Sequence, residues 1–307
     1  MARTKKPASE SSEGLLRLVL HLTLAVIFIS AMISLFRVCQ VYVDRRWAFP
    51  SQPPKVVLDN RPPWMSDFLA NEIAKTAQPI GLHSAFDRQL LIDTNNLLKS
   101  NPWIRQVNQI RRAYAQSPGD TLLIDCDYRA PVALVKWGDF FWLVDAEGTK
   151  LPEQYTVDQM PKILFGPDGS INVRIITGIQ HAPPESGKIW MGNDLAGGLE
   201  LAKLLAGQNY AEAIRQIDVT NFDGRHDSQA AQIILLTEFG TQIRWGRPPS
   251  AKDAFIEVPA ATKLAALRSI YDQKKRVDAN EPWIDVRFDR VTCPDPGTLD
   301  TASANAH

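Results

Sequence analysis

The feature that most limits this chain of 307 residues is an uncharged stretch from Leu18 to Phe36. As a helix with a rise of about 1.5 Å per residue, its nineteen residues extend about 28 Å, close to the ~30 Å hydrocarbon thickness of a bilayer. Twelve of the nineteen are Leu, Ile, Val or Phe, which favour insertion into lipid. The sequence therefore predicts one membrane-spanning helix over residues 15–37, anchored by side chains that include Leu18, Phe28 and Phe36.

Two other interpretations of this stretch are a cleaved signal peptide and the buried helix of a soluble protein. A signal peptide has a shorter apolar core of about 7 to 15 residues, followed by a cleavage site of small residues. Here the apolar run continues past the weak cleavage candidate at residues 29–31. We therefore prefer the anchor.

The orientation of the anchor does not follow from local charge, because basic residues stand on both sides of it. Long domains, however, cross the membrane largely regardless of their charge, and a short basic N-terminal tail is usually cytoplasmic. We expect residues 1–14 to form a cytoplasmic tail and residues 38–53 a juxtamembrane linker. The remaining chain is then extracytoplasmic.

Composition restricts the partners and the chemistry. Lys plus Arg and Asp plus Glu number 34 each, so the sequence has no basic excess that would indicate nucleic-acid binding. The three cysteines, at positions 39, 126 and 293, form no CxxC redox or zinc motif. A disulfide between Cys126 and Cys293 stays open at this point.

The first folded module is predicted to contain two helices and three strands. A short strand covers residues 56–58, and a helix starts at the prolines 62 and 63, with one apolar face formed by Trp64, Phe68, Leu69 and Ile73. A second helix follows Asp87, a strand covers residues 104–114, and residues 117–120 form a turn. The last strand alternates clearly, with apolar residues at 122, 124 and 126. This order predicts a compact α+β module.

The second module is predicted to be rich in strands. Gly138 and Asp139 join two strands as a hairpin. Helices are expected over residues 194–206 and 259–275, and the strands expected between and after them cover residues 214–219, 232–238, 241–245 and 283–291. The overall prediction is an α+β fold with an open sheet and flanking helices.

Short motifs occur in a recognisable order behind the anchor. They are NPWIRQV at 101–107, IRR at 110–112, DTL at 120–122, RAPVA at 129–133, LVDAEG at 143–148, MPKILFG at 160–166 and WIDVRF at 283–288. In this order they resemble the FtsQ/DivIB family of bacterial cell-division proteins. The resemblance implies a POTRA domain of order β-α-α-β-β over residues 54–130 and an FtsQ-type β domain over 131–293. The small polar residues of the last segment predict a disordered tail over 294–307.

The resemblance also implies a function. Family members are scaffolds of the cell-division machinery (the divisome) in the cytoplasmic membrane at the division septum, and bind partners of the FtsB/FtsL type. It points to residues 283–291 as an exposed edge strand that receives a partner strand. Ile284, Val286 and Phe288 are then expected to face the core, and Asp285, Arg287 and Asp289 to face outward. The alternative is that residues 283–291 form an ordinary interior strand. The partner-binding residues expected from this strand and the preceding helix are Trp283, Asp285, Arg287, Asp289, Val291, Leu264 and Tyr271.

Motifs of catalysis or cofactor binding are missing from the sequence. It contains no GxSxG elbow, no HExxH and no metal-spaced group of His, Cys and carboxylates. We therefore expect no enzyme activity, no cofactor, no metal and no small-molecule substrate. Two alternatives remain open: another POTRA-bearing secretion or assembly factor, and a membrane-anchored hydrolase. Septal localisation of a fluorescent fusion would separate the scaffold from the secretion factor.

Overall fold

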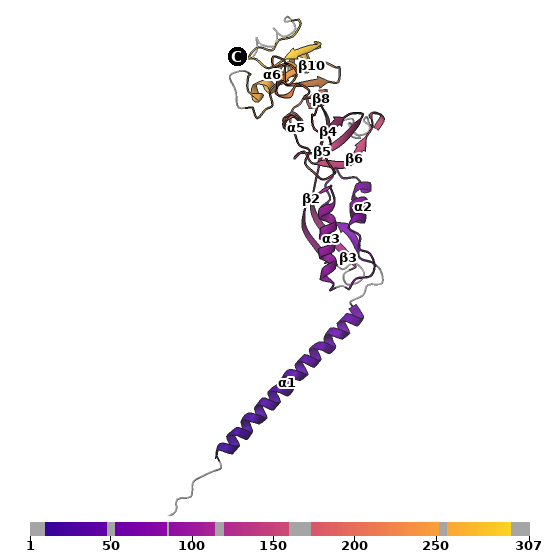
Figure 1. The fold of residues 1–307 in the computed structure, drawn as a ribbon, viewed down its shortest axis with the longest axis vertical. Coiled ribbons are helices and arrows are strands. Elements are labelled where there is room, and N and C mark those ends of the chain that lie inside the picture. The colour runs from indigo at the N-terminus through magenta and orange to yellow at the C-terminus, as the bar shows by residue number, and fades with distance from the viewer. Residues whose placement is uncertain are drawn as a thin grey trace, which may run out of the picture. The chain divides into compact units, whose positions relative to one another are not determined.

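The computed structural model of the protein describes residues 10–47, 53–84, 86–113, 120–159, 173–251 and 257–295. Several predicted features lie outside these ranges: most of the turn at 117–120, the motif at 160–166, and nearly all of the tail from residue 294. The described part is a mixed α and β fold with one apolar N-terminal helix and a large sheet (Figure 1).

The N-terminal helix α1 (Glu10–Trp47) is continuous and longer than the predicted span (Figure 1). Its segment Arg17–Val43, 27 residues that include an 18-residue window with a mean hydropathy of 2.4, is long and apolar enough to cross a membrane. The side chains of Leu18, Phe28 and Phe36 are 61%, 67% and 70% exposed. Because α1 ends at Trp47, it continues into the predicted linker at 38–53. The first proline of that linker, Pro50, follows the end of the helix.

Two hydroxyl side chains within the apolar segment of α1 bond to the helix itself. The hydroxyl of Thr23 donates to the carbonyl oxygen of Leu20 (2.9 Å), and that of Ser30 donates to the carbonyl oxygen of Ile27 (2.9 Å). Local bonds of this kind reduce the cost of placing a hydroxyl in lipid, where water cannot pair with it. These residues therefore do not oppose a membrane position for α1.

Contacts divide the chain into two compact units. The first consists of the chain up to Arg61 with residues 67–98 and 107–125, and the second of residues 62–66, 99–106 and the chain from Cys126 onward.

A three-stranded sheet has the order β1-β3-β2, with β1 (Lys55–Leu58) parallel to β3 (Thr121–Tyr128). Between β1 and β2 (Ile104–Ala113), the chain forms α2 (Asp67–Thr76) and α3 (Arg88–Ser100). The alternation predicted for β3 is confirmed, because Leu122, Ile124 and Cys126 are at most 1% exposed. The elements follow the order strand, helix, helix, strand, strand.

The start of α2 differs from the prediction. The helix begins at Asp67, while residues 62–65 form a turn in which the Met65 N–H donates to the Pro62 carbonyl oxygen (3.1 Å). Trp64 therefore precedes the helix, and the predicted apolar face was wrong for Trp64 and Phe68, whereas Leu69 is half-buried. Of the residues in α2, only Ile73 is buried, and Phe68 is 77% exposed.

The large sheet contains eight described strands in the order β11-β10-β9-β8-β7-β4-β5-β6. The pairs β4–β7, β7–β8 and β10–β11 are parallel, and the other pairs are antiparallel. The strands are β4 (Pro131–Trp137), β5 (Phe140–Asp145), β6 (Lys150–Tyr155), β7 (Arg174–Thr177), β8 (Ile214–Asp218), β9 (Ile233–Thr237), β10 (Gln242–Gly246) and β11 (Trp283–Asp285). Three short turns of 3-10 helix lie at Val157–Gln159, Ala211–Ala213 and Phe222–Gly224.

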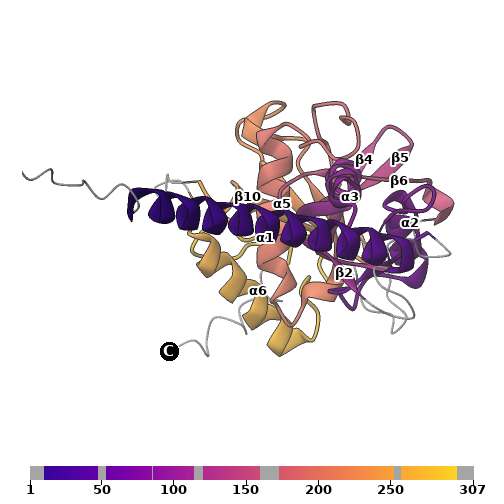
Figure 2. The ribbon, with the colours of Figure 1, turned by 90° about the horizontal axis from the view of Figure 1, so that it is seen from below.

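In the described part of this unit lie the helices α5 (Asn193–Ala206) and α6 (Ala260–Lys274) (Figure 2). An added Cβ on Gly198 of α5 would lie 3.1 Å from Cγ2 of Ile176 on β7, so glycine permits close packing of α5 on the sheet. Leu267 and Ile270 of α6 belong to the same buried cluster. The strand side chains buried in this core include Ile176, Ile217, Ile233, Leu235, Ile243, Trp245 and Ile284.

Candidate functional site

The strand β11 is the last strand of the large sheet and lies at one end of it. It runs parallel to β10, with Trp283 opposite Gln242 and Asp285 opposite Arg244. On its other side, the N–H of Asp285 donates to the carbonyl oxygen of Thr292 (2.8 Å), and the N–H of Thr292 donates to that of Asp285 (3.1 Å). The returning chain therefore already pairs with the outer backbone groups of Asp285.

The strand predicted over residues 283–291 was too long, because β11 ends at Asp285. The guanidinium of Arg287 folds back on the Asp285 carboxylate, with Nε 3.0 Å from Oδ1 and Nη2 2.8 Å from Oδ2. Such a two-point, charge-assisted contact allows both side chains to be largely withdrawn from water. The side chain of Asp285 is 6% exposed and that of Arg287 is 15% exposed. The bond to Asp285 raises the pKa of Arg287. The turn that this pair makes ends the strand.

The predicted directions of the side chains were partly wrong. Ile284 and Val286 are buried, as predicted, at 0% and 1% exposure. Phe288 was expected to face the core and is 48% exposed. Asp285 and Arg287 were expected to face outward, but their ion pair is largely buried.

Trp283 is partly exposed, and Cζ of Arg244 lies 4.0 Å from the centroid of its ring. A guanidinium over an indole face is a favourable cation–π contact, and it holds the ring in a fixed position. Asp289 is exposed, as predicted, whereas Val291 is partly buried against the core.

The two predicted contact residues of α6 pack inward. Leu264 and Tyr271 are partly buried against the core. The hydroxyl of Tyr210 donates to the carbonyl oxygen of Leu264 (3.2 Å), and the rings of Tyr210 and Tyr271 lie 6.2 Å apart. These contacts leave only part of either side chain accessible to another protein.

The sheet face opposite α5 and α6, here called the open face, carries two rows of side chains. The residues that point away from the buried cluster lie opposite one another on neighbouring strands, and so form continuous rows across the sheet. One row is Ile175, Gln216, Leu236, Gln242 and Trp283, and the other is Thr177, Asp218, Ile234, Arg244 and Asp285. Apart from Asp285, each of them is at least partly exposed. Mixed rows of aliphatic and polar groups suit an interface that also remains soluble alone.

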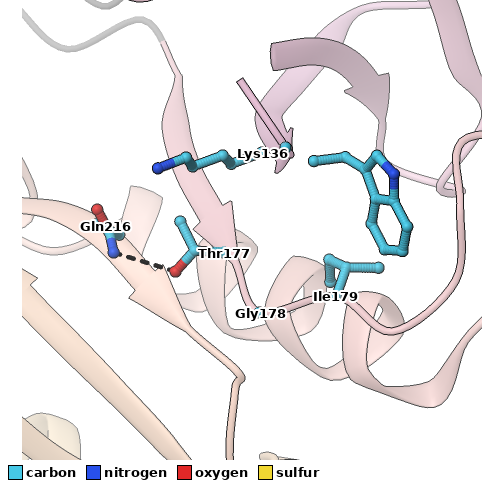
Figure 3. Close-up of a pocket in the computed structure, with 7 residues that line it drawn as sticks. Lys136, Thr177, Gly178, Ile179 and Gln216 are labelled. Atoms are coloured by element: carbon cyan, nitrogen blue, oxygen red, sulfur yellow. Dashed lines mark hydrogen bonds between the residues drawn. The ribbon is translucent and has the colours of Figure 1, made fainter. Parts of the chain in front are cut away.

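An open depression of about 520 Å³ lies at the ends of β4, β7 and β8. Figure 3 shows its side chains, with a hydrogen bond from Gln216 Nε2 to Thr177 Oγ1 (3.0 Å). Its lining is Lys136, Trp137, Gly138, Thr177, Gly178, Ile179 and Gln216. The amine of Lys136 and the amide of Gln216 can pair with acceptors on a bound segment, and Trp137 and Ile179 offer apolar contact.

Other potential reactive groups are not brought together in the described residues. Among them, no group of three or more His, Cys, Asp or Glu side chains is arranged to hold a metal ion. Within the same part of the chain no disulfide joins Cys126 to Cys293, and each is a buried thiol.

A buried carboxylate that the sequence analysis did not identify lies after α6. Asp278, 1% exposed, accepts hydrogen bonds from Nε and Nη2 of Arg276 (2.9 Å each), from the Asn280 N–H (3.0 Å) and from the Thr241 hydroxyl (3.1 Å). Burial alone would raise its pKa, but these bonds outweigh burial and the pKa of Asp278 is lowered. The ionised carboxylate therefore connects the segment after α6 to Thr241, in the turn between β9 and β10.

In the variant Asp278→Asn, the free energy of unfolding is expected to fall less steeply than in wild type as the pH is lowered into the acid range. With a pKa below the unfolded value of about 3.9, the Asp278 carboxylate stabilises the fold above that pH and ceases to do so as the pH falls through its folded-state pKa. The measurement is the free energy of urea unfolding between about pH 3 and pH 7. Asp289→Asn, at an exposed carboxylate, is the control and should retain the wild-type profile. Equal acid slopes for Asp278→Asn and wild type would contradict this.

Several residues of the open face were not predicted from the sequence. Their position depends on which face of each strand the helices leave uncovered, and composition does not indicate this. The alternation in Gln216-Ile217-Asp218 and in Ile233 to Leu236 was the available signal. It identifies two faces of each strand, but not which face the helices leave uncovered.

Comparison with protein-family models finds no match for this chain, and no curated protein is significantly similar to it in sequence.

Proposed function

We propose that the protein is a membrane-anchored, non-enzymatic scaffold of the bacterial cell-division machinery, similar to FtsQ/DivIB. In this proposal α1 is a single-pass anchor in the cytoplasmic membrane, with a cytoplasmic N-terminus and extracytoplasmic domains that act at the division septum. The length and apolar character of Arg17–Val43 support the anchor. The ordered motifs from 101–107 to 283–288 support the family.

The first domain is proposed to be of the POTRA type, over residues 54–130. What supports this is the chain order strand, helix, helix, strand, strand, with β3 in the middle of the three-stranded sheet. The proposed second domain, residues 131–293, carries the binding surface.

The single observation that carries the proposed mechanism is the position of β11 at the end of the large sheet. Because alternate residues of a strand direct their backbone groups to the same side, the N–H and C=O of Trp283 point away from β10, like those of Asp285. An extended segment of a partner can therefore add to β11 as a further strand. The partner is a small single-pass protein of the FtsB/FtsL type.

Thr292 occupies part of this edge and has to be replaced. Two backbone hydrogen bonds hold it to Asp285, and each contributes only about 1 kcal/mol net. A partner strand that makes the same two bonds keeps their number unchanged, and further bonds at Trp283 and side-chain contacts offset the cost of association. Confinement of both proteins to one membrane raises their effective concentration, so modest contacts are sufficient.

The proposal is tested by photocrosslinking in dividing cells. A benzophenone amino acid in place of the exposed Phe288 is expected to capture a short coiled-coil membrane protein. The matched control carries the same probe at Lys203, an exposed position of α5, and should not capture it. Adding Trp283→Ala should reduce capture at Phe288 by about tenfold or more, since buried tryptophans dominate many interfaces.

Three results would count against the scaffold. Equal capture from Phe288 and Lys203 would show that the edge is not selective. Unchanged capture with Trp283→Ala would show that the edge contributes little. Capture of a β-barrel component in place of a coiled-coil protein would favour a secretion or assembly factor.

A further inference from the structure

The connection between α2 and α3 presents three large apolar side chains to solvent. Ile80, Leu82 and Phe86 are 95%, 54% and 64% exposed. Ile80 is the most exposed large hydrophobic residue in the described part of the chain, α1 included. Neighbouring apolar side chains left in water mark a surface that another apolar phase covers.

Polar contacts hold this connection in one conformation. The His83 ring lies with Nε2 3.0 Å from the Ile80 carbonyl oxygen and Nδ1 3.0 Å from Oδ2 of Asp87. From β2, the guanidinium of Arg112 donates to the carbonyl oxygens of Ser84 and Asp87, at 2.6 Å each. The Asp87 carboxylate also accepts the N–H groups at the start of α3. The apolar side chains are thus displayed on an organised turn.

The same turn is bonded to the chain that leaves α1. The side-chain amide of Gln78 donates to the carbonyl oxygen of Pro54 (2.7 Å), and both Pro54 and the neighbouring Pro79 are buried. Seven residue steps connect Trp47, where α1 ends, to Pro54. At no more than about 3.6 Å per residue, this tether cannot exceed about 25 Å.

The short tether between Trp47 and Pro54 keeps the turn close to the lipid if α1 spans the membrane. The apolar segment of α1 ends at Val43, only four residues before the helix does. The chain therefore leaves the membrane near the point from which the tether is counted, and Ile80 follows Gln78 by two residues. No comparable restraint in the described chain ties the exposed apolar residues of the second unit to α1.

We propose that Ile80, Leu82 and Phe86 insert into the interfacial layer of the membrane that holds α1, and so dock the first folded unit on the lipid surface. The partner is the boundary between headgroups and acyl chains, which suits side chains that penetrate a few ångströms from a rigid turn. This inference rests on the membrane anchor of the proposed function. It does not depend on division partners or on β11.

The test uses the full-length protein reconstituted in lipid vesicles, with Cys39 replaced by alanine. An environment-sensitive fluorophore is attached to a cysteine at Leu82, at Phe28 in α1, or at Met191, which is 70% exposed in the second unit. Lipids carrying a nitroxide near the headgroup serve as the quencher for the probes at Leu82 and Met191, and lipids carrying it along the acyl chain serve as the quencher for the probe at Phe28. We expect the probe at Leu82 to emit at shorter wavelength and to be quenched, and the probe at Met191 to behave as in water.

A second variant makes the result specific. Ile80→Glu places a charge on the same turn and is expected to lower the docked fraction of the Leu82 probe by about tenfold. Because Ile80 is almost fully exposed, this variant should unfold at the same urea concentration as wild type. Ile80→Ala, a smaller apolar change, should give an intermediate loss.

The probe at Phe28 separates failure of the two proposals. Quenching at Phe28 without quenching at Leu82 would overturn the docking of the turn and leave the anchor intact. Absence of quenching at Phe28 would overturn both. Equal quenching at Leu82 and Met191, or quenching at Leu82 that Ile80→Glu does not reduce, would also overturn the inference.

Discussion

Replacement of Asp194 by alanine is expected to lower the free energy of unfolding by about 3–5 kcal/mol, because it leaves a partly buried cation without its counterion and two N–H groups without their acceptor. The Asp194 side chain is 4% exposed, and its Oδ2 lies 3.0 Å from Nη2 of Arg225. The same carboxylate accepts the N–H of Gln180 (2.9 Å) and the N–H of Leu195 (2.8 Å). One side chain thus joins three separate segments: the chain after β7, the start of α5, and the chain after β8.

Urea unfolding of the full-length protein in micelles, followed by tryptophan fluorescence, measures this effect. The N–H of Gln180 bonds to Oδ2 of Asp194 and the N–H of Leu195 to Oδ1. Asp194→Asn therefore keeps an acceptor for only one of them, and it should be less damaging than alanine but still destabilising. Lys75→Ala removes an exposed ion pair with Glu72, whose side chains are 73% and 46% exposed, and should change stability very little. A loss for Asp194→Ala no larger than for Lys75→Ala would show that the buried pair is unimportant.

Replacement of Glu257 by alanine is the second large effect, and about 3–5 kcal/mol is again expected. The ammonium of Lys263, 3% exposed, lies 2.6 Å from Oε2 of Glu257 and 2.7 Å from the carbonyl oxygen of Trp245. Burial lowers the pKa of Lys263, and Glu257 opposes that shift. Without Glu257 the lysine is left charged in an apolar environment above the Trp245 ring.

A double-mutant cycle tests this pair. Lys263→Met together with Glu257→Ala removes both charges, so the double variant should be more stable than Glu257→Ala alone. The single variant Glu257→Ala should also recover stability as the pH rises through the lowered pKa of Lys263, because the neutral amine is easier to bury. Additive losses in the cycle would contradict direct coupling of Lys263 and Glu257.

Local patterns predicted those elements whose period is visible in the sequence. The uncharged run from Leu18 to Phe36 lies in α1, and the alternation of Leu122, Ile124 and Cys126 matches the burial of β3. Both patterns depend only on the geometry of a helix or a strand, so neighbouring residues suffice to reveal them.

Predictions that required knowledge of distant segments were less accurate. Asp285 was expected outward because it is charged, yet Arg287 turns back and neutralises it. Phe68 was expected inward because it is apolar, yet α2 starts late and leaves it exposed. In each case a contact or boundary outside the local period decided the outcome.

The amino-acid sequence by itself determined that this protein has one apolar helix, and it determined where most strands and helices begin and end, because hydrophobic period and turn residues act over a few positions. Only the tertiary structure decided that β11 ends the sheet, that Thr292 covers part of its edge, and that Ile80 is left in solvent. The physical reason is that strand order, edge pairing and exposure come from hydrogen bonds and packing between segments far apart in the chain. No single segment carries that information.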